Sequence, residues 1–289
     1  MKKTKRWLAI ALCALLLLPM MQGCKQKTPE EIFSDALANM GKMESMHMNM
    51  SMQLEMSVMG QKMNMKIGAE ADAITNPVKG KMDMKMEVGG MSMQMPMYYE
   101  QQGDAFMTYI GMDDGSGVVW YRQQAENAPV NNNLLSASAM AGFEYIEEER
   151  EDENTLRYRG MMDAQQLKSL LETSMSGELD ALTGGNADML DAVLDEIGKT
   201  EMIVTVDKQS GYIVRQELDM GPMMRAIMTK ALESSGEEAL DLDMSSLIEI
   251  GEMPVLIDYS EFNTVPDFEI PAAAREGELL QEGEEPTAA

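Results

Sequence analysis

The sequence is poor in the residues on which much enzyme and metal chemistry depends, with two cysteines and one histidine among 289 residues. Nucleophilic catalysis of the Ser/His/Asp or Cys/His type needs a histidine beside the nucleophile, and His47 is the only candidate. The sequence also lacks a glycine-rich phosphate loop, the ligand spacing of a zinc site and a calcium-loop pattern. We therefore expect a protein that is not an enzyme and that holds no metal or other cofactor within its fold.

Basic residues are scarce as well. The chain has 23 Lys and Arg against 49 Asp and Glu, which gives a net charge of −26. A field of this sign opposes binding to nucleic acid and to anionic membrane surfaces, because neither phosphate neutralisation nor polybasic attraction is available. We interpret the charge as a solubility feature and expect no nucleic-acid partner.

Residues 1–23 read as a targeting segment. Basic residues at positions 2, 3, 5 and 6 precede an apolar stretch, Trp7 to Leu18, that is too short to span a bilayer comfortably. Gly23 then precedes Cys24, an arrangement that resembles a bacterial lipoprotein signal. The resemblance implies that Cys24 carries a diacylglycerol and becomes the mature N-terminus; an ordinary secretory signal is the alternative.

This interpretation fixes the expected location. Residues 24–29 become a tether, and the protein is anchored by lipid to the outer face of the cytoplasmic membrane. Cys13 leaves with the signal, so that the mature chain has no intramolecular disulfide and must fold on its hydrophobic core alone.

Methionine is the residue in excess, with 34 in the chain and 17 between Met40 and Met97. From Met46 to Val58 all seven even positions are apolar and all six odd positions are polar. A period of two is that of a β-strand, and it places the apolar side chains on one face. His47 falls on the opposite, polar side.

Two glycine turns extend this pattern into an antiparallel meander. A two-residue loop at 60–61, with Gly60 first, would pair Met56 with Met65. A second loop at 89–90 would pair Met86 with Met93. Both turns place apolar residues opposite apolar residues, which predicts a sheet with one apolar face and one polar, solvent-facing face.

The rest of the chain alternates between strands and short helices. Thr28 as N-cap and Pro29 at the first helical position predict a helix that ends near Gly41. Apolar residues at helical spacing predict further helices over 163–175, 189–197 and 221–233. Together with about eleven strands, the last at 255–262, they predict one α+β domain over residues 30–272 and a disordered acidic tail over 273–289.

Three local features resemble a known family. They are the segment 31–33 leading into 46–48, the hairpin over 206–212 and the closing segment 265–271. The chain is similar in these to the LolA/LolB/LppX-like group of lipoprotein and lipid carriers, and closest to uncharacterised LolA-like lipoproteins of Gram-positive bacteria. The resemblance implies an antiparallel open half-barrel whose concave apolar face is covered by helices and binds acyl chains.

We therefore expect a monomeric, membrane-anchored lipoprotein that binds a lipid or another apolar ligand. The residues expected to form the apolar ligand face are Met46, Met48, Met50, Met52, Leu54, Met56, Met63, Met65, Ile67, Met82, Met84, Met86, Met91, Met93, Met95 and Met97.

Two alternatives remain open at this point. Thioethers are soft ligands that select Cu(I), so that Met46, Met48 and Met50 could form a copper site. Such a site needs only two or three converging sulfurs, whereas many more share this face. The second alternative is a structural or sensor lipoprotein in which methionine fills the core and no ligand is bound.

Overall fold

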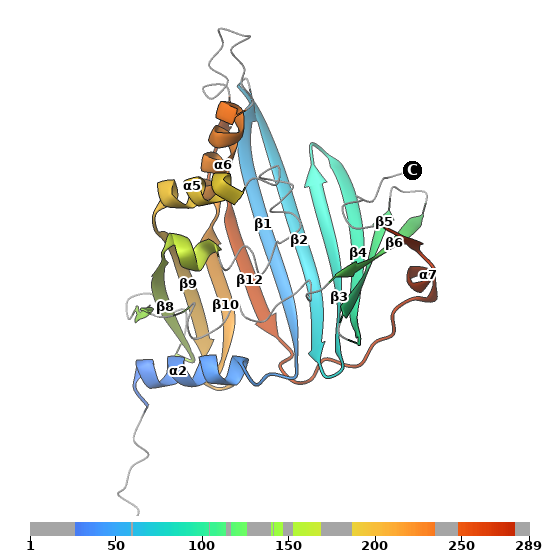
Figure 1. Cartoon of the computed structure of the whole chain (residues 1–289). Coiled ribbons are helices and arrows are strands. Elements are labelled where there is room, and N and C mark those ends of the chain that lie inside the picture. Colours follow the sequence, from blue (N-terminus) through green and yellow to red (C-terminus); the bar gives the residue numbers. More distant parts are fainter. Residues whose placement is uncertain are drawn as a thin grey trace, which may run out of the picture.

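The computed structural model describes residues 27–58, 60–103, 105–113, 117–125, 140, 142–146, 153–168, 187–234 and 248–280. Cys24, the predicted signal segment and the part of the predicted helix beyond Lys168 lie outside these residues. Figure 1 shows a large, open and almost entirely antiparallel sheet with a few helices at its ends. The α+β class and the unclosed sheet agree with the prediction from sequence.

The sheet has 13 strands in the order β13-β6-β5-β4-β3-β2-β1-β12-β10-β9-β8-β7, and β11 pairs with β1 off this path. In chain order the strands are β1 (Ser45–Val58), β2 (Gln61–Thr75), β3 (Val78–Val88), β4 (Met91–Gln102), β5 (Ala105–Asp113), β6 (Val118–Ala125), β7 (Glu144–Tyr145), β8 (Thr155–Met162), β9 (Thr200–Asp207), β10 (Tyr212–Asp219), β11 (Ile248–Ile250), β12 (Pro254–Ser260) and β13 (Glu278–Leu279). The sequence predicted about eleven strands. The two additional ones, β11 and β13, are three and two residues long.

The described helices of three or more turns are α2 (Pro29–Met40), α5 (Ala187–Ile197) and α6 (Gly221–Ser234). Helix α2 begins as predicted, because the Thr28 side chain accepts a hydrogen bond from the backbone N–H of Glu31. The Glu31 carboxylate in turn accepts from the backbone N–H of Thr28, which completes a capping box. The chain leaves the helix at Gly41.

The loop between β1 and β2 differs by one residue from the prediction. The strands end at Val58 and resume at Gln61, so that Gly60 takes the second loop position, where its φ of +76° costs glycine little. Met56 consequently pairs with Met63 rather than with Met65. Moving the loop by one residue slides the register by two, which leaves every side chain on its predicted face.

The second loop is as predicted. Gly89 and Gly90 both have positive φ, as a tight hairpin turn of type I′ requires. Met86 pairs with Met93 and Met84 with Met95. The methionines of four consecutive strands therefore lie on one surface of the sheet.

One hydrophobic core joins the helices to the sheet. Its helical members include Phe33 of α2, Val193 of α5 and Ile227 of α6, all of them buried. They pack against strands β8, β9, β10, β12 and β1. Figure 1 shows α2 crossing one end of these strands while α5 and α6 lie at the other end.

The C-terminal segment extends the ordered structure beyond residue 272. Helix α7 (Ala272–Arg275) and strand β13 lie within the stretch that was predicted to be a disordered tail from residue 273. Strand β13 pairs with the edge of β6, and the backbone N–H of Leu280 donates to the carbonyl of Arg122 at 2.9 Å. The prediction of disorder is therefore wrong for residues 273–280.

Candidate apolar-ligand face

The paired strands divide the sheet into two chemically different surfaces. We call the Met face the surface formed by the even positions of β1 and β3 and the odd positions of β2 and β4. Strand pairing places all sixteen residues of the predicted ligand face on this surface. We call the opposite surface the polar face.

One half of the Met face is covered. Met46 is 3% exposed and Leu54 is 4% exposed, and both belong to the core beneath the helices. Met48, Met50, Met52, Met56 and Met65 are partly buried against the same core. These residues stabilise the fold by burial, at about 1.5–3 kcal/mol for a fully buried side chain of this size.

The other half of the Met face is more open. Among the residues that the structure describes, the core cluster contains none from β3, β4, β5 or β6. Exposure rises towards the hairpin tips, where Met63 and Met93 are each 43% exposed and Met91 is 76% exposed. Monomeric proteins seldom leave large contiguous apolar patches open unless the patch has a function.

The Met face also carries no charge over six strands. The pairing of β4 with β5 and of β5 with β6 continues it to Thr108, Ile110, Tyr121 and Gln123. No Asp, Glu, Lys or Arg of β1 to β6 occupies a position on this surface. The surface is therefore suited to an apolar ligand. An ionised group of a ligand would find no charged side chain of β1 to β6 to pair with on it.

The polar face carries the only histidine, as predicted. The Nδ1 of His47 lies 2.6 Å from one carboxylate oxygen of Asp72, and the Nζ of Lys81 lies 2.8 Å from the other. Burial acts to raise the pKa of Asp72, but the hydrogen bonds from Lys81 and His47 outweigh it and hold this pKa below its ordinary value. These three groups form a cross-strand network that stabilises the sheet.

This network predicts a pH dependence. Because the pKa of Asp72 is lower in the folded chain than in the unfolded one, its contribution to stability is present above about pH 4 and is lost as the pH falls through the folded value. Asp72→Asn is expected to lower the free energy of unfolding by roughly 1 kcal/mol at pH 7. Urea unfolding at pH 7 and pH 3 measures this.

The matched control is Asp83→Asn, which changes an exposed carboxylate on the same face. It should leave the stability nearly unchanged at both pH values. An Asp72→Asn deficit that persists undiminished at pH 3 contradicts the assignment of the effect to the ionised carboxylate.

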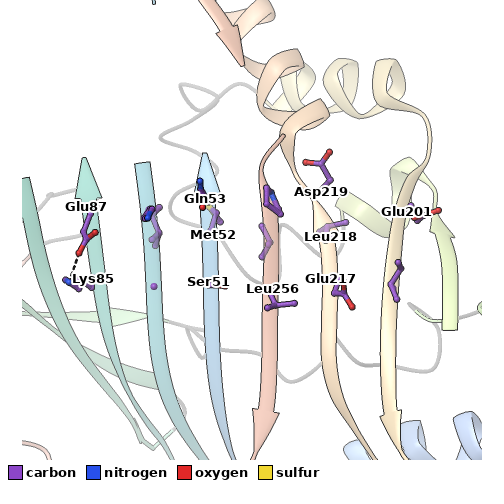
Figure 2. Close-up of a pocket in the computed structure, with 16 residues that line it drawn as sticks. Ser51, Met52, Gln53, Lys85, Glu87, Glu201, Glu217, Leu218, Asp219 and Leu256 are labelled. Carbon is purple, nitrogen blue, oxygen red and sulfur yellow. Dashed lines mark ion pairs between the residues drawn. The ribbon is translucent and has the colours of Figure 1, made fainter. Parts of the chain in front are cut away.

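A groove of about 710 Å³ opens on the polar face (Figure 2), and its lining includes two residues of the predicted ligand face, Met52 and Ile67. Its carboxylates already have partners. Glu87 pairs with Lys85 at 2.5 Å, Glu217 with Arg157 at 2.8 Å, and Glu201 with Arg159 at 3.2 Å. Asp219 accepts from the backbone N–H groups of Gly221 and Met253. The carboxylates that line the groove therefore stabilise the fold.

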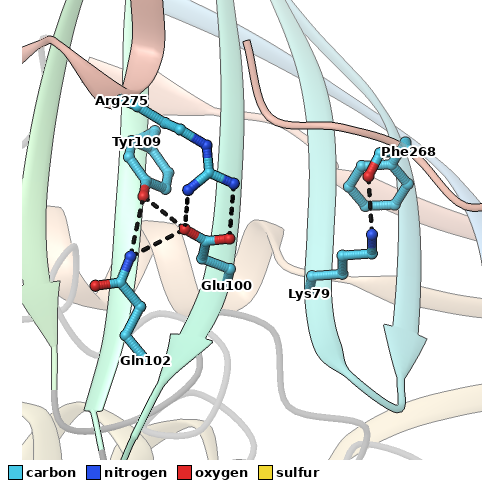
Figure 3. A network of polar contacts seen from close by, with 6 residues as sticks. All are labelled: Lys79, Glu100, Gln102, Tyr109, Phe268 and Arg275. Atoms are coloured by element: carbon cyan, nitrogen blue, oxygen red, sulfur yellow. Dashed lines mark hydrogen bonds and ion pairs between the residues drawn. The ribbon is translucent and has the colours of Figure 1, made fainter. Parts of the chain in front are cut away.

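The C-terminal segment covers another part of the polar face (Figure 3). Arg275 forms a bidentate pair with Glu100, at 2.6 and 3.0 Å, and the Tyr109 hydroxyl donates to the same carboxylate at 2.8 Å. Lys79 donates to the carbonyl of Phe268 and lies over its ring. The polar face of β3 to β5 is thus partly closed, which leaves the Met face as the candidate site.

Two kinds of feature, a metal-binding cluster and a bilayer-spanning helix, can be assessed for the residues that the structure describes. It contains no group of three or more His, Cys, Asp or Glu placed to hold a metal ion. No described helix has the length and apolar character needed to cross a bilayer. Of the methionines of the copper alternative, Met46 is buried in the core, and Met48 and Met50 pack against that core.

Several residues of this face were missed by the sequence reasoning. Ala69, Ala71 and Ala73 of β2 and Tyr99 of β4 are buried on the Met face beyond the last predicted methionine. The same period of two continues through them, so that extending the alternation past Ile67 and Met97 would have found them. Ala69 was expected on the apolar side of the hairpin but was not counted as part of the ligand face.

Comparison with known proteins gives a family without a described function. No curated protein matches the chain. It is similar to the solved structure of LprF from Mycobacterium bovis, with 11% identity and a TM-score of 0.41 over 85% of this chain and 98% of that one. It is also similar to a DUF1329 family protein from Desulfovibrio piger, with 8% identity and a TM-score of 0.24 over 81% and 91% of the two chains. The model of the DUF6612 family, described as a family of unknown function, matches residues 28–278. Since this match spans most of the sequence, the chain belongs to the DUF6612 family.

Proposed function

We propose that this protein is a lipid-anchored lipoprotein of the cell envelope that binds a lipid or another apolar molecule on its Met face and catalyses no reaction. The observation that carries the proposal is the open half of the Met face. It has no charged residue from β1 to β6, and its exposure rises to 76% at Met91. An apolar ligand would remove this surface from water.

Methionine suits such a surface for a physical reason. Its side chain is unbranched, with a polarizable thioether, so that one surface adapts to guests of irregular shape. The open methionines come from three neighbouring strands rather than from one, which gives the face width as well as length.

The anchor and the fold family belong to the same proposal. Cys24 would carry the diacylglycerol, and the tether would hold the domain at the outer face of the cytoplasmic membrane. The open antiparallel sheet and its helices support the LolA-like interpretation of the fold, and a Gram-positive source is part of the proposal. A chain held in this way would receive or present its ligand close to the bilayer, as a monomer.

The test is a charge placed on the Met face. Met93→Glu introduces a carboxylate at an exposed position, so that the fold tolerates it, but an apolar ligand at this position would have to bury it. We expect the affinity for a fluorescent apolar probe to fall at least about tenfold, since 1.4 kcal/mol is enough for that loss. Fluorescence titration of the purified chain measures it.

Gln94→Glu is the matched control. It adds the same charge at the next residue of β4, on the polar face, where it should not change binding. Equal losses in both variants would point to a general charge effect and refute the site. Absence of probe uptake by the wild-type chain, with no co-purifying lipid in native mass spectrometry, would refute the function and favour a ligand-free role.

A further inference from the structure

The Met face changes character at one end. Strand pairing aligns Gly80 of β3, Tyr99 of β4, Thr108 of β5 and Gln123 of β6 in a single row. Three of these four residues bear polar, uncharged side chains. Next to them along β4 come Met97 and the other methionines, so that a short polar row closes one end of an apolar face.

The Tyr99 ring lies over Gly80. A Cβ added at Gly80 would be 2.2 Å from Cε1 and 2.6 Å from the hydroxyl oxygen of Tyr99, which shows that the ring occupies the space above this glycine. The hydroxyl thus extends from β4 across β3, on the Met face. Gly80 is the residue that makes this position available.

The Tyr99 and Thr108 hydroxyls have no hydrogen-bond partner in the part of the chain that the structure describes. Taken over the whole residue, Tyr99 is 7% exposed and Thr108 is 8% exposed. Neither oxygen is among the described buried side-chain atoms that lack a hydrogen-bond partner, so both oxygens keep contact with solvent, and a polar group of a ligand can replace the water there. Burial also raises the pKa of Tyr99 to about 12, so that its phenol stays protonated near neutral pH and both donates and accepts.

The charge-free surface selects the kind of head group. A carboxylate or phosphate brought to this row would lose its hydration without meeting a Lys or Arg from the Met face of β1 to β6. A hydroxyl or an ester carbonyl loses much less and finds the hydroxyls of Tyr99 and Thr108. The row therefore favours an uncharged polar head.

The Met face is long enough to hold the acyl chain of a molecule with such a head group. Tyr99 and Met91 are eight positions apart along β4, a distance of about 27 Å along the strand. One leaflet of a bilayer contributes about half of its ~30 Å hydrocarbon core. A long acyl chain that starts at Tyr99 would thus end before the exposed hairpin tip.

We propose that the ligand is a neutral amphiphile, with its hydroxyl or ester head at Tyr99 and Thr108 and its acyl chain along Met97, Met95 and Met93. This inference rests on the proposed function, since it specifies the ligand class of the same face. Tyr99 and Thr108 then determine specificity, while the methionines supply most of the affinity.

Three pyrene-labelled probes of equal chain length test it: a plain hydrocarbon, a monoacylglycerol and a fatty acid, titrated at pH 8. We expect the wild-type chain to bind the monoacylglycerol at least about tenfold more tightly than the ionised fatty acid. Tyr99→Phe should weaken monoacylglycerol binding roughly 2- to 10-fold and leave hydrocarbon binding unchanged. Thr108→Val should act in the same direction.

The matched control is Tyr98→Phe, which removes a hydroxyl from the neighbouring residue on the polar face and should change no affinity. Unchanged monoacylglycerol binding in both Tyr99→Phe and Thr108→Val overturns the head-group assignment, as does equal wild-type affinity for the fatty acid. In those cases hydrocarbon binding persists and the proposed function stands. Failure of all three probes to bind the wild-type chain refutes the proposed function as well.

Discussion

Phe33→Ala is expected to lower the free energy of unfolding by about 3–5 kcal/mol. Phe33 is 8% exposed, and its ring stacks on Tyr158 of β8 with a centroid distance of 4.4 Å. The Phe143 ring also stacks on the Phe33 ring, with a centroid distance of 6.0 Å. Removal of the Phe33 ring leaves a cavity that the neighbouring strands are too rigid to fill. It also weakens the packing of α2 on the sheet.

Urea unfolding followed by circular dichroism measures this loss. Ser34→Ala is the control, because Ser34 is an exposed neighbour in the same helix and its replacement leaves the core intact. A Phe33→Ala deficit below 1 kcal/mol would mean that α2 does not seal this end of the core.

Gly80→Ala is expected to destabilise the chain by about 1–3 kcal/mol, although alanine is usually better than glycine within a strand. The new methyl group would lie 2.2 Å from the Tyr99 ring, and the ring must move to admit it. A displaced ring carries its hydroxyl away from the Met face. The same variant should therefore lose the preference for a neutral head group.

A double-mutant cycle isolates this contact. In a Tyr99→Ala background the ring is gone, and Gly80→Ala should then stabilise the strand by about 0.5–1 kcal/mol. The sign of the effect reverses between the two backgrounds. Equal effects in both would show that the ring does not depend on the space above Gly80.

The division of the sheet into two faces could be predicted because it depends only on whether a residue has an odd or an even position in its strand. Met56 pairs with Met63 instead of Met65, yet both methionines stay on the Met face. A hairpin slip of two residues conserves the alternation, so that an inexact turn assignment still gives the right surface. The helix start at Thr28 was predictable for a similar reason, because caps are local signals.

Long-range packing could not be predicted in this way. The apolar residues of 273–280 follow no strand or helix period, and the order of this segment depends on contacts such as Arg275 with Glu100, which lie 175 positions apart. Ala274 is buried beside Tyr109 of β5. A local pattern carries no information on such partners, and the acidic composition alone suggested disorder.

The candidate site was predictable in part. The methionine positions followed from the period, whereas the polar row did not, because Tyr99 and Thr108 are adjacent only through the pairing of β4 with β5. The division into a covered and an open half depends on where α2, α5 and α6 pack. That arrangement is a property of the tertiary structure.

The position of strand β12 in the sheet affects how the chain can fold during synthesis. It lies between β1 and β10, so that it joins the half-sheet from β1 to β6 to the half-sheet from β7 to β10. Until residues 254–260 have been synthesised, both halves present an unpaired strand edge, and such edges can pair with other chains. The acidic charge of the chain then acts before folding is complete, because repulsion between nascent molecules keeps these edges apart while the last strand is awaited.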